Sequence, residues 1–273
     1  GRTQIDYFSM PTPGNSADFG DLVQRRMETA GFSNGSRAVV VAGQYRSASN
    51  VWTNINTSEY VTIATLSNAT SQGTMPHNTR NLMAVGNSTT GLIASGEGGD
   101  PNGIYAQTTA TLGTATFFGN LVAANMYQAA GTNSETRALW SGGQNTLTNI
   151  VYNTIATSSN STTFGVFTPI AGGAVAAGRK QHSALTDGTY AVFGGMTAGW
   201  GTSFTHSCDY VTIDTLGNTT DFGDLLESHT FGCATSNGTI GVWIAGSPSA
   251  YINSISYITI ATPGNATDFG DLT

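Results

Sequence analysis

The sequence has little charge of either sign. Lys, Arg, Asp and Glu make up 9% of its 273 residues, the formal net charge is −7, and no run of basic residues occurs. Proteins that bind nucleic acids neutralise phosphates with clustered Lys and Arg, so we expect no nucleic-acid partner. The chain also lacks an apolar run of the roughly 18 residues that a transmembrane helix needs, and we expect no membrane insertion.

Cysteine is scarce as well. Cys208 and Cys233 are too few for a disulfide framework. Hydrophobic residues make up 39% of the chain and aromatic residues 10%, so the low charge does not indicate disorder. The 35 glycines, together with many Thr, Val, Ile, Asn and Ser, favour strands joined by turns. The composition therefore predicts an all-β protein.

One segment recurs along the chain. TPGNATDFGDLT at 262–273 has near copies at 12–22 and 215–226. Weaker copies lie at 65–75, 111–121 and 157–167. Six copies about 50 residues apart indicate a repeat architecture, and this period is in the range of β-propeller blades.

Each repeat contains four short segments. A small-residue strand comes first, and an apolar strand that ends in glycine follows, as at 37–43, 137–143 and 240–246. The third segment alternates with a period of two, as at 59–65 and 256–262, which is typical of a half-buried strand. The fourth is the DFGDL segment. We therefore expect four-stranded blades that end near residues 75, 121, 167, 226 and 273, with Trp140 and Trp243 in the core.

These features carry two resemblances. Gly-Gly pairs follow apolar strands at 142–143 and 194–195, and Tyr152 and Tyr210 stand in the next strands. The pattern resembles the kelch, or galactose-oxidase-like, propeller family along essentially the whole chain, although Phe19, Phe222 and Phe269 stand where a kelch repeat more often has Trp. Units such as YITIATPGNATDFGDLT are also similar to repeats in structural and fibre proteins of marine and freshwater phages.

The copy number is uneven. Segments one and two occur five times, whereas segments three and four occur six times, because residues 1–22 add an N-terminal half-repeat. We expect five complete kelch-like blades over 23–273. The half-repeat either pairs with a neighbouring subunit or continues an upstream domain; alternatively it lies along the outer edge of the ring, or the ring is an incomplete six-bladed one.

Two of the four histidines and both cysteines form a candidate metal set. His206, Cys208, His229 and Cys233 lie within 28 residues and are types that bind zinc. The alternative is that each packs separately within its strand. Copper chemistry of the galactose-oxidase type would need further ligands on the axis, and only His77 and His182 remain.

Catalytic patterns are missing from the sequence. The Asp pairs of the DFGD motif recur with the repeat, so we interpret them as structural. We expect no catalytic residues, no cofactor and no enzymatic activity. A carbohydrate-active or copper enzyme on the same scaffold is the alternative.

The loops between segments two and three vary most, and variable loops on a rigid scaffold often bind ligands. Tyr45, Trp52 and Trp200 lie there among Ser, Thr and Asn, a setting that suits sugar rings. The alternative is that these aromatics cap blade edges or contact subunits. Sequons for N-glycosylation, used only if the source allows, occur at Asn34, Asn56, Asn68, Asn87, Asn160, Asn218, Asn237 and Asn265.

The resemblances and loops together suggest a role. We expect an extracellular structural or adhesive module, such as a phage virion fibre or decoration protein or another extracellular filament subunit. Its partners would be further copies of itself or other virion proteins, and a cell-surface glycan. A purely architectural spacer is a second alternative.

Overall fold

The computed structural model describes residues 2–94, 96–122, 126–144, 148–168, 179–198, 203–247 and 250–272. Within these ranges every regular element is a β-strand, so none of them contains a helix that could cross a membrane. The prediction of an all-β protein is confirmed.

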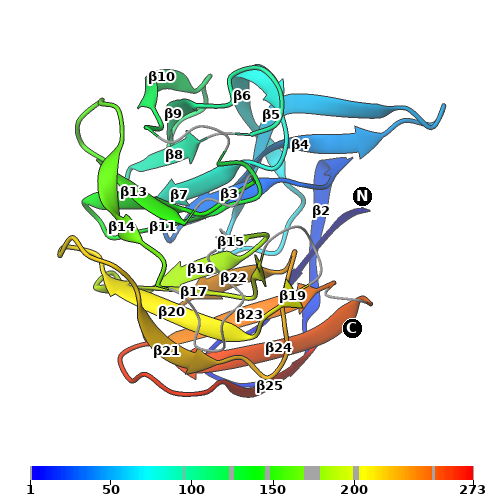
Figure 1. Cartoon of the computed structure of the whole chain (residues 1–273). Coiled ribbons are helices and arrows are strands. Elements are labelled where there is room, and N and C mark those ends of the chain that lie inside the picture. The colour runs from blue at the N-terminus through cyan, green and yellow to red at the C-terminus, as the bar shows by residue number, and fades with distance from the viewer. Residues whose placement is uncertain are drawn as a thin grey trace.

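Five four-stranded antiparallel blades follow one another around one axis (Figure 1). Blade one comprises β3 (Ala30–Ser33), β4 (Arg37–Arg46), β5 (Trp52–Thr62) and β6 (Thr70–Thr79). Blade two comprises β7 (Met83–Gly86), β8 (Thr90–Ala94), β9 (Gly103–Thr108) and β10 (Thr116–Asn120). Blade three comprises β11 (Ala130–Asn133), β12 (Arg137–Ser141), β13 (Asn149–Thr154) and β14 (Thr162–Val166). Blade four comprises β16 (Ser183–Thr186), β17 (Tyr190–Gly194), β20 (Ser207–Thr212) and β21 (Thr220–Asp224), and blade five β22 (Cys233–Ser236), β23 (Ile240–Gly246), β24 (Ile252–Thr259) and β25 (Thr267–Asp271).

Two smaller sheets complete the described structure. β15 (Arg179–Lys180), β18 (Thr197–Ala198) and β19 (Ser203–Phe204) form a three-stranded sheet beside blade four. β1 (Arg2–Tyr7) and β2 (Ala17–Arg26) form an N-terminal pair. The predicted five-bladed propeller with an extra N-terminal half-repeat is therefore confirmed.

The Phe-Gly of the repeated motif permits close packing between blades. A Cβ atom added at Gly223 would lie 2.6 Å from the carbonyl oxygen of Gly264 in the next blade, and one at Gly165 would lie 1.9 Å from that of Gly217. Gly223 also has a φ of 135°, which side chains other than glycine rarely adopt. The preceding phenylalanine, such as Phe222, is buried in the core. The motif thus packs at the seam, the contact between neighbouring blades. This is a structural role.

The hydrophobic core lies between neighbouring blades. Trp140 and Trp243 are fully buried, as predicted. Trp243 of blade five packs in one cluster with Leu185 and Cys208 of blade four. Each blade therefore depends on its neighbour for burial of its apolar face.

The N-terminal pair lies in the ring, between blade five and blade one. The backbone N–H of Asp21 donates to Asn68 Oδ1 (3.0 Å), and the N–H of Asp271 donates to Asn15 Oδ1 (3.4 Å). Complete blades make the same contact, from the N–H of Asp224 to Asn265 Oδ1 (3.0 Å). β1 and β2 thus stand where strands three and four of a sixth unit would stand, and β2 runs on to Arg26 at the start of blade one.

Candidate functional site

The axial ring, formed by Glu28, Asn81, Gln128, Gln181 and Phe231, contributes one residue per blade at one mouth of the propeller. All five have left-handed backbone conformations, with φ from 53° to 61°. The N–H of each of the last four members donates to the carbonyl oxygen of the preceding member, at 2.9, 3.2, 2.7 and 3.0 Å in order from Asn81 to Phe231. The ring surrounds a small cavity of about 110 Å³. Backbone strain of this kind persists where surrounding contacts hold it.

One side of the axial ring is charged. Arg80 forms ion pairs with Glu28 (3.2 Å) and Glu97, and Gln44 Nε2 donates to Glu28 Oε2 (2.7 Å). Burial raises the pKa of Glu28, while the positive charge of Arg80 opposes this effect. Arg80 thus pairs with both carboxylates, and its single positive charge offsets one of their two negative charges.

The opposite side of the ring is neutral. Gln181 Nε2 lies 3.3 Å from Gln128 Oε1, and Thr197 Oγ1 donates to Gln181 Oε1 (3.0 Å). Phe231 completes this side and is 60% exposed. The mouth therefore combines amides, a cluster of two carboxylates with one guanidinium, and one exposed aromatic ring.

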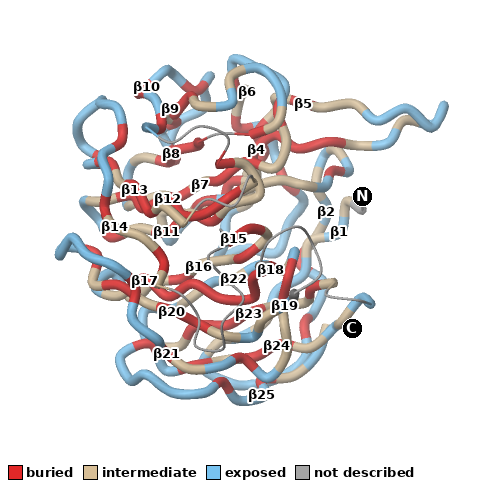
Figure 2. The backbone as a smooth tube through the Cα atoms, in the orientation of Figure 1, coloured by how far each residue is buried: buried red, intermediate tan, exposed pale blue. Residues whose placement is uncertain are grey.

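A hairpin arm, residues 43–55, extends from the same face. β4 and β5 continue beyond the other strands of blade one and project to the right in Figure 1, with an exposed tip in Figure 2. Val51 is 57% and Trp52 49% exposed, and the Arg46 guanidinium lies 5.3 Å from the Trp52 ring. Arg25 Nη2 donates to the carbonyl of Arg46 (2.7 Å) and ties the arm to the ring.

The loop aromatics that we predicted as ligand contacts are in different settings. Trp52 lies opposite Arg46 and Tyr45 opposite Thr53, so consecutive pairs place Trp52 and Tyr45 on opposite faces of the arm. The structure therefore brings them to one hairpin but not to one surface. Trp200 lies outside the described residues.

The four residues of the candidate metal set have separate environments. His206 is exposed, Cys208 is buried between blades four and five, and Cys233 is exposed on β22. His229 is buried, with Nδ1 2.6 Å from the carbonyl of Ala245 and Nε2 2.9 Å from Ser256 Oγ. Burial lowers the pKa of His229. Both cysteines are free thiols, and the described residues contain no group of three His, Cys, Asp or Glu that could hold a metal.

The other two histidines also lie apart. His77 is exposed, with its ring 6.0 Å from that of Tyr105. His182 is buried against Phe167 and Phe193, 3.0 Å from Ser141 Oγ. Burial, with a smaller contribution from the charge of Arg179, lowers the pKa of His182 to about 3. A neutral histidine in this setting packs as a core residue.

The sequon asparagines have structural roles. The Oδ1 atoms of Asn68, Asn160, Asn218 and Asn265 each accept a backbone N–H from the neighbouring unit. Those of Asn34, Asn87 and Asn237 accept backbone N–H groups within their own turns. Asn56 Nδ2 donates to the carbonyl of Met75 (2.9 Å). These contacts explain why Asn recurs in the repeat, and glycosylation stays a prediction.

Sequence reasoning missed the axial ring. Its members stand two residues after Arg26, Thr79, Met126, Arg179 and His229, so they recur with the repeat. No single side-chain type is common to all five, because the property that repeats is the left-handed backbone conformation. Periodicity alone could have located them.

Comparison with known proteins supports the fold. No protein-family model and no curated protein matches this chain. Among solved structures, that of YjhT matches with a TM-score of 0.72 and 10% sequence identity, over 93% of this chain and 87% of that one. At this identity the likeness shows a shared β-propeller fold and nothing about activity.

Proposed function

We propose that this propeller is a non-enzymatic adhesive module that binds a surface carbohydrate through its hairpin arm. The observation that carries the proposal is the arm itself: a polar hairpin that projects from the ring and exposes Trp52. A side chain of this size that served only packing would be buried in a seam, as Trp140 and Trp243 are.

The chemistry of the arm suits a sugar. Carbohydrates place their C–H faces on aromatic rings, and their hydroxyl groups pair with polar neighbours. The tip supplies Ser47, Ser49 and Asn50, and Ser47 Oγ lies 3.0 Å from Ser49 Oγ. The Arg46 guanidinium adds donors beside the indole ring. We propose an extracellular setting such as a phage fibre, a decoration protein or another filament, which rests on the resemblance of the repeats.

A glycan array probed with the 273-residue chain tests this function. We expect binding to a restricted set of glycans, and we expect Trp52→Ala to weaken it at least tenfold, since stacked aromatics carry much of the binding energy. Leu112→Ala is the matched control, because Leu112 is 64% exposed in a turn of blade two and should leave binding unchanged.

Three results would contradict the proposal. An array without binding would favour an architectural spacer. Glycan turnover or copper retained after purification would favour an enzyme. Equal weakening by Trp52→Ala and Leu112→Ala would show that the arm is not the contact surface.

A further inference from the structure

The inner part of the ring is open at one place. The innermost strands pack in succession, β3 with β7, β7 with β11, β11 with β16 and β16 with β22. Among the described strands, no comparable packing joins β22 back to β3. The hydrogen-bonded chain of the axial ring likewise runs from Glu28 to Phe231. The ring is thus closed at its perimeter by β1 and β2, and open inside them.

Blade one exposes the face that a preceding blade would cover. Ala38 and Val40 are half-buried. The residues at the same two places in the other blades are buried: Gly91 and Ile93, Ala138 and Trp140, Ala191 and Phe193, Gly241 and Trp243. In those blades the cover is the first strand of the preceding blade, as where Leu185 lies against Gly241.

Blade five exposes the opposite face. Cys233 and Thr235 of β22 are exposed. Their counterparts in blades two and three are buried: Met83 and Val85, Ala130 and Thr132. Nothing in the described structure stands where a following blade would pack against β22.

The N-terminal strand β1 is also left uncovered on its inner side. Ile5 is half-buried and Asp6 exposed. At the place of Ile5 the third strands carry buried residues: Ser58, Ile104, Ile150, Cys208 and Ile255. β1 pairs only with β2, so its inner edge is unpaired among the described strands. The half-buried apolar side chains of Ile5, Ala38 and Val40 and the free edge of β1 thus border the same gap in the ring.

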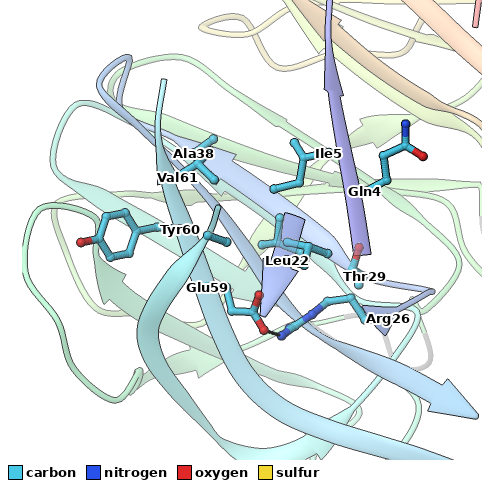
Figure 3. Close-up of a pocket in the computed structure, with 11 residues that line it drawn as sticks. Gln4, Ile5, Leu22, Arg26, Thr29, Ala38, Glu59, Tyr60 and Val61 are labelled. Carbon is cyan, nitrogen blue, oxygen red and sulfur yellow. Dashed lines mark hydrogen bonds and ion pairs between the residues drawn. The ribbon is translucent and has the colours of Figure 1, made fainter. Parts of the chain in front are cut away.

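A cavity of about 430 Å³ occupies this gap on the side of blade one. We call it the slot, and Ile5, Leu22, Ala38, Val40 and Ala69 supply its apolar lining. Figure 3 shows Ile5, Leu22 and Ala38 around its interior, with the Arg26–Glu59 ion pair on one side. An apolar lining and a free edge together suit an added strand.

We infer that the slot is a docking site for a β-hairpin of this same repeat type, supplied from outside residues 1–273. The occupant supplies strands one and two of the sixth blade. Its second strand pairs with the free edge of β1, and its apolar side chains cover Val40 on one side and β22 on the other. The other five positions show that a hairpin with four cross-strand pairs fits, as Ser183–Thr186 pairs with Ala191–Gly194.

The carboxylate of Asp6 calls for a positively charged residue on the docked hairpin. In blades one, four and five, the residue four places before strand one contacts the residue at the position of Asp6. Arg26 pairs there with Glu59, and Arg179 with Asp209. Where the third strand carries Ser256, the partner is His229. Asp6 accepts a hydrogen bond from Gln4 Nε2 (2.9 Å) and has no salt bridge among the described residues.

The occupant therefore carries an arginine four residues before its first strand. Arg opposite an acid is the combination that this chain itself uses in blades one and four. Charge complementarity of this kind fixes partner and register in associated strands. This proposal does not depend on carbohydrate binding by the arm.

A peptide with the sequence of residues 179–195 tests the inference, since it holds the Arg and both strands of blade four. We expect the labelled peptide to bind the 273-residue chain saturably in fluorescence anisotropy and to slow hydrogen exchange at residues 2–7. Asp6→Lys should weaken binding at least tenfold. A peptide in which Asp replaces the first Arg should restore binding to the Asp6→Lys chain.

Asp214→Lys is the matched control. Asp214 is exposed in a turn of blade four, so the same change of charge there should leave peptide binding unchanged. Absence of binding, or equal weakening by both variants, overturns the inference. Concentration-dependent oligomers that disappear when the arm tip is replaced by Gly-Gly would show that a second copy's arm fills the slot, and would overturn it as well.

Discussion

The seam between blades four and five and the seam around the N-terminal pair have the same hydrogen bonds at the outside of the ring. They differ in how the apolar side chains pack at the inside. In both, an Asp N–H donates to the Asn of the next turn, for Asp224 and Asn265 at 3.0 Å and for Asp271 and Asn15 at 3.4 Å. In the first seam Trp243 is fully buried against blade four. In the second, Val40 stands half-buried beside the slot.

The difference separates two tasks of a blade. Strands three and four, with their Asn turns, fix the position of a unit around the ring, and the N-terminal half-repeat shows that they do this without strands one and two. The inner strands supply the burial of apolar surface, which is the larger part of stability. A half-repeat can therefore be placed correctly and still leave its neighbours exposed.

Truncation of an aromatic in the complete seam should have the largest effect. Trp243→Ala removes a fully buried side chain, and we expect a loss of about 4 kcal/mol in the free energy of unfolding. Val40→Ala, at the matching position beside the slot, should cost less than about 1 kcal/mol, because little burial is lost. Urea denaturation of both variants measures the contrast, and equal losses would show that the slot is packed in solution.

The paired acids offer a second contrast. Asp209→Asn leaves Arg179 buried without its counter-charge, and we expect a loss of about 3 kcal/mol. Asp6→Asn at the equivalent exposed position should change stability by less than about 0.5 kcal/mol. Denaturation at pH 7 gives both values. A large cost for Asp6→Asn would mean that Asp6 already has a buried partner.

Much of this fold could be predicted because the same strand pattern recurs in every repeat. Period-two alternation gave the third strand, and the buried tryptophans followed from apolar segments. The place of the half-repeat could not be predicted, since residues 12–22 resemble the other copies. Its position depends on contact between Asn15 and Asp271, which are 256 residues apart.

The candidate site was harder to predict for a local reason. The register of the arm shifts between Val41 and Gly43, and this irregularity sets which face Trp52 and Tyr45 occupy. Sequence alternation alone does not reveal a β-bulge. The axial ring escaped notice because any residue can supply a left-handed backbone and an N–H group.

The buried histidine of a complete seam gives the smallest effect, as a dependence on pH. The pKa of His182 is about 3 in the folded chain, against an ordinary value near 6.5 when unfolded. Between these values the unfolded chain binds the proton and the folded chain does not. Stability from His182 is therefore complete above about pH 6.5 and declines as the pH falls towards 3.

We expect the free energy of unfolding to fall by about 2 kcal/mol from this residue between pH 7 and pH 5, since each unit of pH is worth about 1.4 kcal/mol. His182→Gln removes the titrating group and should reduce the pH dependence by that amount. His206→Gln, at an exposed position, should leave the dependence unchanged. If His182→Gln and the parent chain lose stability equally on acidification, His182 is protonated in the folded state, and the seam beside Phe167 and Phe193 admits water.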